Sequence, residues 1–587
     1  MSFNIVGISA HFHDSACAVL RDGRLVAAAS EERFSRRKYD QAIPQYAFQY
    51  CLREAGLKIA DIDCVAYYED PQEKLERQIA MMLPGLPGDW RTLQKLDPGR
   101  PEREIRQVLG CDCPLRIVKH HEAHAASSFY FSGFTEAAVF TADGVGEWAT
   151  TTYGRASLAS GIDLLETVKF PDSLGLLYSA LTSYLGFGVN DGEYKVMGLA
   201  PYGRPRFVDR LERLIELCPG AQYRLVPEYF DFRSQHRMYS DELCQLLGQP
   251  ARCADSEILS FHQDVARSIQ ELLEQVLLSK IRYLWKIVPL DTLCMAGGVA
   301  LNCVANSAIR KHGPFHRIFV QPAAGDAGGA IGAAALAHAS LAGAPPGERL
   351  EHVYLGPQYS EAEVANVIDA IRPDLPNCPS SENVLLADTA DRLANGQIVG
   401  WFQGRMEFGP RALGARSILA DPRNPTMRDR INALVKKREA FRPFAPAVLW
   451  SRAREHFDID HPSPFMLETC QVKSPLDLPA ITHVDGSARV QTVDDCTNPR
   501  FAALLLAFEQ RTSCPILLNT SFNMKDEPIV CTPLDALICF VRANLDALVL
   551  EDFLIEPLPF GPVRRALINA SVPLNASAIT HKIYTLV

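Results

Sequence analysis

The sequence predicts an α/β protein of at least two domains, in which the first half repeats one structural unit. Three features indicate this: apolar strands that end at acidic and glycine-containing turns, the recurrence of that pattern, and a change in composition near residue 350. A chain of 587 residues is also too long for a single hydrophobic core.

The chain begins with a strand and a hairpin. Residues 5–10 form an apolar run, and two further runs at residues 16–20 and 25–29 are separated by Asp22 and Gly23. An Asp-Gly pair between two apolar runs is a strong signal for a tight hairpin turn. We therefore expect three consecutive strands at the N-terminus.

The same unit recurs later in the first half. A strand, an acidic residue, a glycine and a second strand follow one another over residues 137–153, and glycine-rich turns occur at residues 295–298 and 324–329. Residues 263–285 have the periodicity of an amphipathic helix. This repetition favours the duplicated nucleotide-binding fold of actin and the sugar kinases, whose glycine turns hold phosphate with backbone N–H groups.

A stretch rich in proline and glycine, residues 344–349, is the best candidate for a domain boundary. We expect a first domain over residues 1–350 and a second α/β domain over residues 351–587. Arginine and lysine become dense soon after the boundary, between residues 404 and 442.

The composition is that of a globular protein in a reducing compartment. Hydrophobic residues make up 47% and charged residues 22%, and the net charge of −10 argues against nucleic acid as the main partner. The sixteen cysteines show no C-x-x-C pair, and no secretory signal precedes the first strand. Residues 327–347 are uncharged but predict a buried helix rather than a membrane span. We expect a cytoplasmic protein with no membrane association; the sequence does not indicate its oligomeric state.

Two histidines and two aspartates form a candidate metal site. His120 and His124 are four residues apart and share one face of a helix, while Asp143 follows a buried strand and Asp326 lies in a glycine-rich turn. Such a mixed set of nitrogen and oxygen ligands suits iron, zinc or manganese and leaves coordination positions open for catalysis. A buried polar network is the structural alternative.

Two further motifs of the first half carry candidate catalytic groups. His13 and Asp14 follow the first strand, and an imidazole beside a carboxylate can act as a general base or can cap a turn. The charged run at residues 31–38 normally indicates a solvated face, although Lys38 could also reach a nucleotide phosphate.

The second half carries a concentrated cationic motif. Arg405, Arg411 and Arg416 lie among glycines, and Lys436 and Arg442 follow in an apolar context. Because buried cations are costly without a counter-charge, we expect an anion to meet them, and arginine matches phosphate bidentately. An exposed basic face is the alternative. Hydroxyl and amide groups suited to the same ligand follow a strand at residues 519–523.

At these residues the chain resembles the O-carbamoyltransferases of antibiotic and Nod-factor biosynthesis, the NodU and CmcH type. The resemblance spans nearly the whole length and rests on several long motifs in the family's order: E-E-R-F at residue 31, H-H-x-x-H-A at 120, D-G-V-G-E at 143, G-E-Y-K-V-M-G-L-A-P-Y-G at 192, G-G-V-A-L-N at 297, G-R-M-E-F-G-P-R-A-L-G at 404, F-R-P-F-A-P at 441 and N-T-S-F-N at 519.

The resemblance implies an N-terminal domain like that of the tRNA threonylcarbamoyl-transferase, of the actin and sugar-kinase superfamily, fused to a YrdC-like domain. The YrdC-like half would make carbamoyl-adenylate from carbamoyl phosphate and ATP with Mg²⁺, and the first half would transfer the carbamoyl group to a hydroxyl of a small-molecule acceptor beside Fe²⁺ or another divalent metal. Lysine and arginine in the order K-x-R at residues 436–438 add to the YrdC likeness.

The resemblance also implies roles for individual residues. The metal ligands would be His120, His124, Asp143 and Asp326, and the catalytic groups would be His13, Asp14, Arg411 and Lys436. Residues in contact with nucleotide in the first domain would be Lys38, Gly144, Gly297, Gly298 and Asn302. Carbamoyl phosphate and ATP in the second domain would be held by Arg411, Lys436, Arg442, Arg489, Asn519 and Ser521.

Three rival functions follow from parts of the sequence. Each half separately suggests a tRNA-modifying carbamoyl or threonylcarbamoyl transferase, but the cationic cluster lies outside the acceptor half. A nucleotide-binding regulator without turnover does not need candidate ligand sets in both halves. A sugar kinase does not need a second domain that binds phosphate groups. The acceptor alcohol itself cannot be identified, because its specificity would come from loops around residues 60–110 and 200–260.

Overall fold

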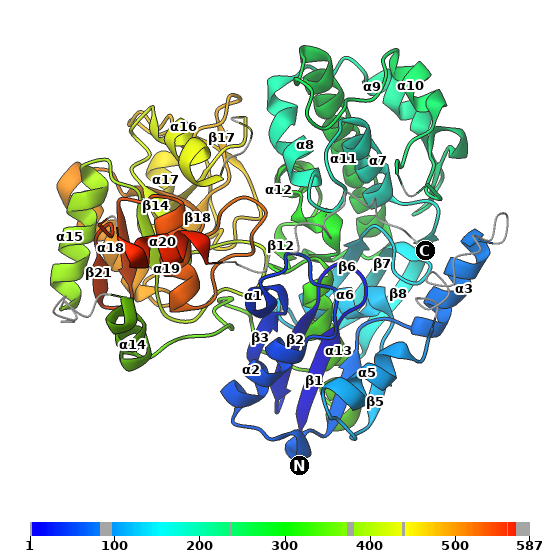
Figure 1. The fold of residues 1–587 in the computed structure, drawn as a ribbon. Helices are drawn as coiled ribbons and strands as arrows, with labels where there is room; N and C mark the ends of the chain where they lie inside the picture. The colour runs from blue at the N-terminus through cyan, green and yellow to red at the C-terminus, as the bar shows by residue number, and fades with distance from the viewer. Residues whose placement is uncertain are drawn as a thin grey trace. The chain divides into compact units, whose positions relative to one another are not determined.

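The computed structural model describes residues 3–82, 97–234, 236–371, 381–436, 439, 441–559 and 561–570. The chain divides into two compact units (Figure 1). The first contains residues 1–31 and 39–350, and the second contains residues 351–574 together with the short segment 32–38. The residues beyond 574 that are grouped with the first unit lie outside the described part of the chain.

The first unit contains two sheets with the same topology. In each, three consecutive strands pair antiparallel and two later strands extend the sheet in parallel from the first of the three. The first sheet has the order β3-β2-β1-β4-β5 and consists of β1 (Asn4–Ser9), β2 (Ala16–Arg21), β3 (Arg24–Ser30), β4 (Cys64–Tyr67) and β5 (Leu115–Ile117). The second has the order β8-β7-β6-β11-β12 and consists of β6 (Glu136–Ala142), β7 (Ala149–Ser157), β8 (Gly161–Lys169), β11 (Thr292–Ala296) and β12 (Arg317–Val320).

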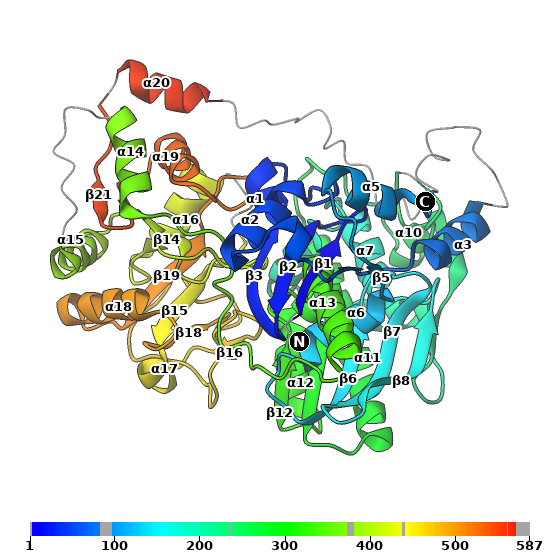
Figure 2. The same cartoon turned by 90° about the horizontal axis from the view of Figure 1, so that it is seen from below.

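Helices pack between and around these sheets. They are α2 (Gln45–Ala55), α3 (Pro71–Met82), α5 (Arg100–Val108), α6 (His120–Phe129), α7 (Leu174–Tyr184), α8 (Glu193–Leu199), α9 (Val208–Leu211), α10 (Asp241–Leu247), α11 (Ser260–Ile287), α12 (Cys303–His312) and α13 (Asp326–Ala342). A small ribbon pairs β9 (Ile215–Leu217) with β10 (Tyr223–Leu225). The helix α13 lies against β1, β2 and α6 (Figure 2).

Close packing of α13 depends on small residues. A Cβ atom on Gly332 would lie 1.7 Å from the carbonyl oxygen of Ala123 in α6, and one on Gly7 in β1 would lie 1.9 Å from the carbonyl oxygen of Ala330. Only glycine permits such close approach of two backbones. The glycine and alanine content of α13 therefore sets how near its first residue, Asp326, comes to α6.

The second unit is built on one mixed seven-stranded sheet of order β18-β15-β19-β14-β13-β20-β21. Its strands are β13 (Val399–Phe402), β14 (Arg416–Ala420), β15 (Ala445–Leu449), β18 (Gln491–Val493), β19 (Ile516–Ser521), β20 (Ala547–Leu550) and β21 (Phe553–Ile555), and a short pair joins β16 (Cys470–Gln471) to β17 (Ser487–Ala488). Its helices are α1 (Glu32–Ser35), α14 (Glu361–Ile371), α15 (Glu382–Ala394), α16 (Met427–Ile431), α17 (Trp450–His456), α18 (Pro499–Thr512), α19 (Pro533–Arg542) and α20 (Pro562–Asn569).

The predicted α/β class and the duplication within the first half are confirmed, since two sheets of the same topology precede a second α/β unit. The repeated strand order explains why the strand–acid–glycine–strand pattern occurs twice in the first half. The helix expected near residues 327–347 is α13, and no helix among the described residues is long and apolar enough to cross a membrane.

Candidate metal centre and active site

The N-terminal turn of α6 places two histidines side by side. Glu147 accepts hydrogen bonds from the backbone N–H groups of His120 and Asp70, both at 2.8 Å, and so fixes the start of the helix. His120 and His124 are separated by one helical turn, and both side chains are 1% exposed. Their Nε2 atoms lie 3.0 Å apart.

Asp143 faces this pair from the loop that follows β6. Its Oδ1 atom accepts hydrogen bonds from the backbone N–H groups of Gly144 at 2.7 Å and Gly298 at 3.2 Å. This leaves Oδ2 directed at the histidines, 3.1 Å from Nε2 of His120 and 3.0 Å from Nε2 of His124. The N–H groups of Gly144 and Gly298, expected from the resemblance to contact nucleotide, are thus directed to a protein carboxylate.

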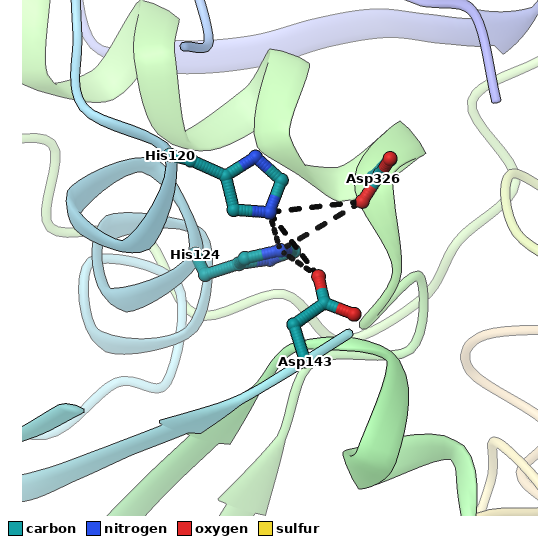
Figure 3. Close-up of side chains that lie close together, drawn as sticks. All are labelled: His120, His124, Asp143 and Asp326. Carbon is teal, nitrogen blue, oxygen red and sulfur yellow. Dashed lines mark hydrogen bonds and ion pairs between the residues drawn. The ribbon is translucent and has the colours of Figure 1, made fainter. Parts of the chain in front are cut away.

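Asp326, the first residue of α13, completes the cluster (Figure 3). Its Oδ1 atom lies 3.8 Å from Nε2 of His120 and 4.0 Å from Nε2 of His124, and its other oxygen is buried. One ligand atom from each of the four residues can be chosen so that all lie within 4.8 Å of one another. The four predicted ligands, which come from three separate segments, therefore meet at one point.

The spacing of these donor atoms suits a transition-metal ion. Ligand atoms about 2.1 Å from an ion lie about 3.0 Å apart at a right angle and about 3.4 Å apart at a tetrahedral angle. The separations of 3.0 to 4.0 Å fall around these values. Two imidazole nitrogens 3.0 Å apart also need a shared proton or a cation, because two unprotonated nitrogens repel each other.

The charges of the cluster perturb one another strongly. Burial lowers the pKa of His120, but its hydrogen bond to Asp143 and the charge of Asp326 outweigh burial and raise that pKa to about 9. Burial and the charge of Asp143 raise the pKa of Asp326 to about 7. For His124, burial and the neighbouring His120 lower the pKa. Such a concentration of perturbed groups in one place is typical of a functional site.

His121 lies beside the cluster but does not belong to it. Its Nδ1 atom is 2.6 Å from the hydroxyl of Thr141, which in turn is 2.5 Å from the hydroxyl of Thr152. Burial and the two neighbouring histidines lower the pKa of His121 well below its usual value. His121 therefore helps to hold α6 against the second sheet.

His13 and Asp14 form the predicted pair after β1. The His13 Nδ1 atom lies 3.1 Å from a carboxylate oxygen of Asp14, and its ring packs against that of Tyr39 with centroids 4.6 Å apart. Desolvation lowers the pKa of His13, but Asp14 and then Asp326 outweigh it and raise the pKa to about 9. Asp326 is thus among the charges that raise the pKa of His13, after Asp14.

A second histidine, not predicted from the sequence, anchors this loop. His11 has a φ of 68°, a left-handed conformation that is rare for a side chain of this size. Its Nε2 atom lies 2.8 Å from Glu104 in α5, and its Nδ1 atom lies 3.2 Å from the hydroxyl of Tyr67. These two contacts hold the loop in a strained conformation, and only the tertiary structure shows them.

Gly297 and Asn302 position the backbone after β11. Gly297 has a φ of 92°, and a Cβ atom there would lie 2.2 Å from the carbonyl oxygen of Ala142. The side chain of Asn302 caps α12 by accepting from the N–H of Ala305 at 3.0 Å and also bonds to Gln270. Both residues therefore have clear structural tasks in addition to the nucleotide contact that the resemblance implies.

The charged segment 32–38 departs from expectation. Lys38 belongs to the second unit, not the first, and Arg33 is buried instead of lying on a solvated face. The sequence gives no sign of this, because a run of arginines and glutamates is usually solvent-exposed.

In the second unit, Lys436 lies in a π-helical turn and is buried. Its ammonium group donates to both the carbonyl oxygen and the hydroxyl of Ser521, at 2.6 and 3.1 Å. It also donates to the carbonyl oxygen of Asn523 at 3.0 Å and its side-chain oxygen at 2.7 Å. The structure thus joins Lys436 and the N-T-S-F-N motif, which are 85 residues apart.

Two arginines of the cationic motif donate their guanidinium N–H groups to carbonyl oxygens of the protein itself. Arg416 is fully buried, donates to the carbonyl oxygens of Gln403, Ala415, Pro357 and Gly404 at 2.9 to 3.0 Å, and lies 3.5 Å from the centre of the Phe402 ring. Arg405 donates to the carbonyl oxygen of Leu355 at 2.8 Å. The expectation that an anion meets every arginine of this motif is therefore wrong for these two.

A buried glutamate shapes the loop that carries Arg411. One oxygen of Glu407 accepts from the backbone N–H groups of Leu413 at 2.7 Å, Ala415 at 2.7 Å and Arg416 at 3.2 Å. Asn519 donates to the carbonyl oxygen of Ala412 at 3.3 Å. Like His11, Glu407 was not predicted from the sequence, although its place just before the glycine turn was an available signal.

The remaining predicted ligands of the second unit are only partly buried. They are Arg411, Arg442 and Arg489. Arg442 lies 3.7 Å from Glu439. The continuation of the K-x-R pattern, Lys437 and Arg438, lies outside the described residues.

Comparison with known proteins agrees with this arrangement. Residues 4–85 and 105–335 match the model of the carbamoyltransferase N-terminus, and residues 390–557 match that of the carbamoyltransferase C-terminus. An uncharacterized protein of Synechocystis is 44% identical over 94% of this chain and 96% of its own length. Nodulation protein NolNO of Sinorhizobium fredii is 40% identical over 96% of this chain and 81% of its own length. Nodulation protein U of Bradyrhizobium diazoefficiens is 31% identical over 87% of this chain and 90% of its own length.

The duplicated α/β unit with a buried cluster of histidine and aspartate, followed by a second α/β unit, defines a two-domain transferase. The chain belongs to the carbamoyltransferase family, and the resemblance seen in its motifs is confirmed.

Proposed function

We propose that this protein is an ATP-dependent O-carbamoyltransferase whose second unit makes carbamoyl-adenylate from carbamoyl phosphate and ATP. Its first unit then transfers the carbamoyl group to a hydroxyl of a small-molecule acceptor. The observation that carries the proposal is the cluster of His120, His124, Asp143 and Asp326, because its donor atoms are spaced for a divalent metal ion and both imidazoles are buried.

The activation step needs cationic groups for two anionic substrates. In this step water attacks the phosphorus of carbamoyl phosphate and the P–O bond to the carbamoyl group breaks, which releases inorganic phosphate and carbamate. A carbamate oxygen then attacks the α-phosphorus of ATP, and pyrophosphate leaves. Arg411, Arg442 and Arg489 are the guanidinium groups that would bind these anions, with Mg²⁺ on the ATP phosphates. Lys436, bonded to Ser521 and Asn523, fixes the N-T-S-F-N loop of the same unit.

The transfer step needs a base and a polarised carbonyl. His13, protonated beside Asp14, would hold the acceptor hydroxyl, and the Asp14 carboxylate would accept its proton while that oxygen attacks the carbamoyl carbon and AMP leaves. A divalent ion such as Fe²⁺ held by the four ligands would supply Lewis-acid polarisation of the carbonyl. Burial of His120 and His124 excludes water, which would otherwise hydrolyse the mixed anhydride.

The direct test is incubation of the purified protein with carbamoyl phosphate, ATP and a panel of alcohols, with intact-mass detection of a carbamoyl gain. Sugar, aminoglycoside, macrolide and oligosaccharide alcohols belong in the panel, with unmodified tRNA as a competing acceptor. We expect carbamoyl transfer to a small alcohol together with release of pyrophosphate. Transfer to tRNA alone would favour the rival function.

Arg411→Ala is expected to abolish both pyrophosphate release and carbamoyl transfer, because its loss removes a bidentate phosphate contact from the activation step. Pyrophosphate release and product mass measured on the same sample check this. Arg428→Ala, which changes a partly exposed arginine of the same unit, is the matched control. Normal pyrophosphate release by Arg411→Ala would contradict the assigned activation site.

Glu104→Gln is expected to lower carbamoyl transfer about tenfold and to leave pyrophosphate release unchanged, because it weakens the contact that holds His11 and the loop of His13. Glu102→Gln, on the same helix but 60% exposed, is the control. Equal transfer rates in Glu104→Gln and Glu102→Gln would show that His11 does not position the loop.

The contact between His11 and Glu104 also depends on pH. The hydrogen bond from His11 lowers the pKa of Glu104 from 4.5 to about 2. The contribution of this contact to folding stability is therefore complete above pH 4.5 and is lost as the pH falls towards 2.

A further inference from the structure

The segment 32–38 comes from the N-terminal half of the sequence but belongs to the second unit. Its side chains are bonded to two loops of that unit. Arg36 donates to the carbonyl oxygens of Ile529 at 2.7 Å and Pro528 at 2.9 Å, and its Nε atom lies 3.6 Å from a carboxylate oxygen of Asp535. Arg33 donates to the carbonyl oxygen of Gly409 at 3.0 Å.

An apolar contact accompanies these hydrogen bonds. Phe34 packs on a small buried cluster made of Met406, Ala412, Ile529 and Cys531. This cluster draws its members from the same two loops that Arg33 and Arg36 hold. The segment therefore ties the loop of residues 406–413 to the loop of residues 528–531.

Both loops lead directly to the candidate anion-binding groups. The first carries Arg411 between Gly409 and Ala412. The second begins just after Glu527, whose carbonyl oxygen accepts from the side chain of Asn523 at 2.7 Å, and Asn523 in turn holds Lys436. Movement of either loop would shift the groups that meet carbamoyl phosphate and ATP.

We propose that Arg33 and Arg36 are positioning residues for the activation step, through which an N-terminal segment orders the substrate site of the second unit. Neither side chain needs to touch substrate, because each has carbonyl oxygens of the loops as partners. The inference rests on the proposed location of carbamoyl-adenylate formation in the second unit.

The test is steady-state pyrophosphate release by the full-length Arg36→Ala variant at varied carbamoyl phosphate. Because small misplacements of binding groups are costly, we expect kcat/KM for carbamoyl phosphate to fall about thirtyfold, mainly through KM. Arg36→Lys keeps the charge and one donor direction and should recover part of the loss. Arg37→Ala, which changes an exposed neighbour in the same segment, should match the wild type.

Two further measurements separate the possible failures. Metal content per chain, which reports the first unit, should be unchanged in Arg36→Ala, and a loss of metal would show general unfolding and overturn the positioning role. If Arg411→Ala abolishes pyrophosphate release but Arg36→Ala has a normal KM, this inference fails and the proposed function stands. If Arg411→Ala also releases pyrophosphate normally, the proposed function itself fails.

Discussion

Replacing His120 by alanine is expected to abolish carbamoyl transfer while pyrophosphate release continues. The substitution removes one of four clustered donor atoms and leaves Asp143 and Asp326 as two facing carboxylates with only one imidazole. Loss of Lewis-acid assistance is worth several kcal/mol, so the transfer rate should fall about a thousandfold or more. Simultaneous assays of pyrophosphate and of carbamoylated product on one sample measure both steps.

A second readout for His120→Ala does not depend on activity. Divalent metal should raise the unfolding temperature of the wild type, since a ligand at a hundred times its dissociation constant stabilises by about 2.7 kcal/mol. The variant should lose this shift. His121→Gln is the control, because His121 bonds to Thr141 and lies outside the ligand set. A wild-type protein that shows no response to Fe²⁺, Mn²⁺ or Zn²⁺ would refute the metal centre.

Replacing Arg416 by methionine is expected to cause the largest loss of stability. The guanidinium is fully buried, and its removal leaves four carbonyl oxygens without their donor and the nearby Glu407 without a compensating charge. Breaking a buried charged network in this way costs about 3–5 kcal/mol. Denaturant unfolding, followed by a probe in the second unit, measures the change.

The control for Arg416→Met is Arg428→Met, since Arg428 is partly exposed and pairs only loosely with Asp429 at 3.5 Å. That change should alter the free energy of unfolding by less than about 0.5 kcal/mol. Addition of ATP and carbamoyl phosphate should not rescue Arg416→Met, because Arg416 is bound by backbone carbonyls. Full rescue by these substrates would mean that Arg416 does meet an anion after all.

Much of the fold could be predicted from local pattern. The strand at residues 5–10, the hairpin around Asp22 and Gly23, and the helix that begins at His120 all appear close to their expected places. These elements depend on the spacing of apolar residues and on turn chemistry, which neighbours along the chain determine. The long helix expected at residues 263–285 is likewise present as α11.

The roles of charged residues were harder to predict. Arg411 and Arg416 occur five residues apart in one motif, yet Arg416 is fully buried among carbonyl oxygens and Arg411 is only partly buried. The difference depends on where distant carbonyl groups lie, and no local pattern encodes it. The same is true of Arg36, whose acceptors are nearly five hundred residues away.

By itself, the sequence determined the strands, the main helices, the duplicated architecture and the identity of four candidate metal ligands, because these depend on short-range spacing and on recognisable motifs. The tertiary structure alone decided that the four ligands meet, which charged groups have partners within the protein, and that residues 32–38 belong to the second unit. Those outcomes depend on close packing between segments far apart in the chain, such as α13 on α6 through Gly332.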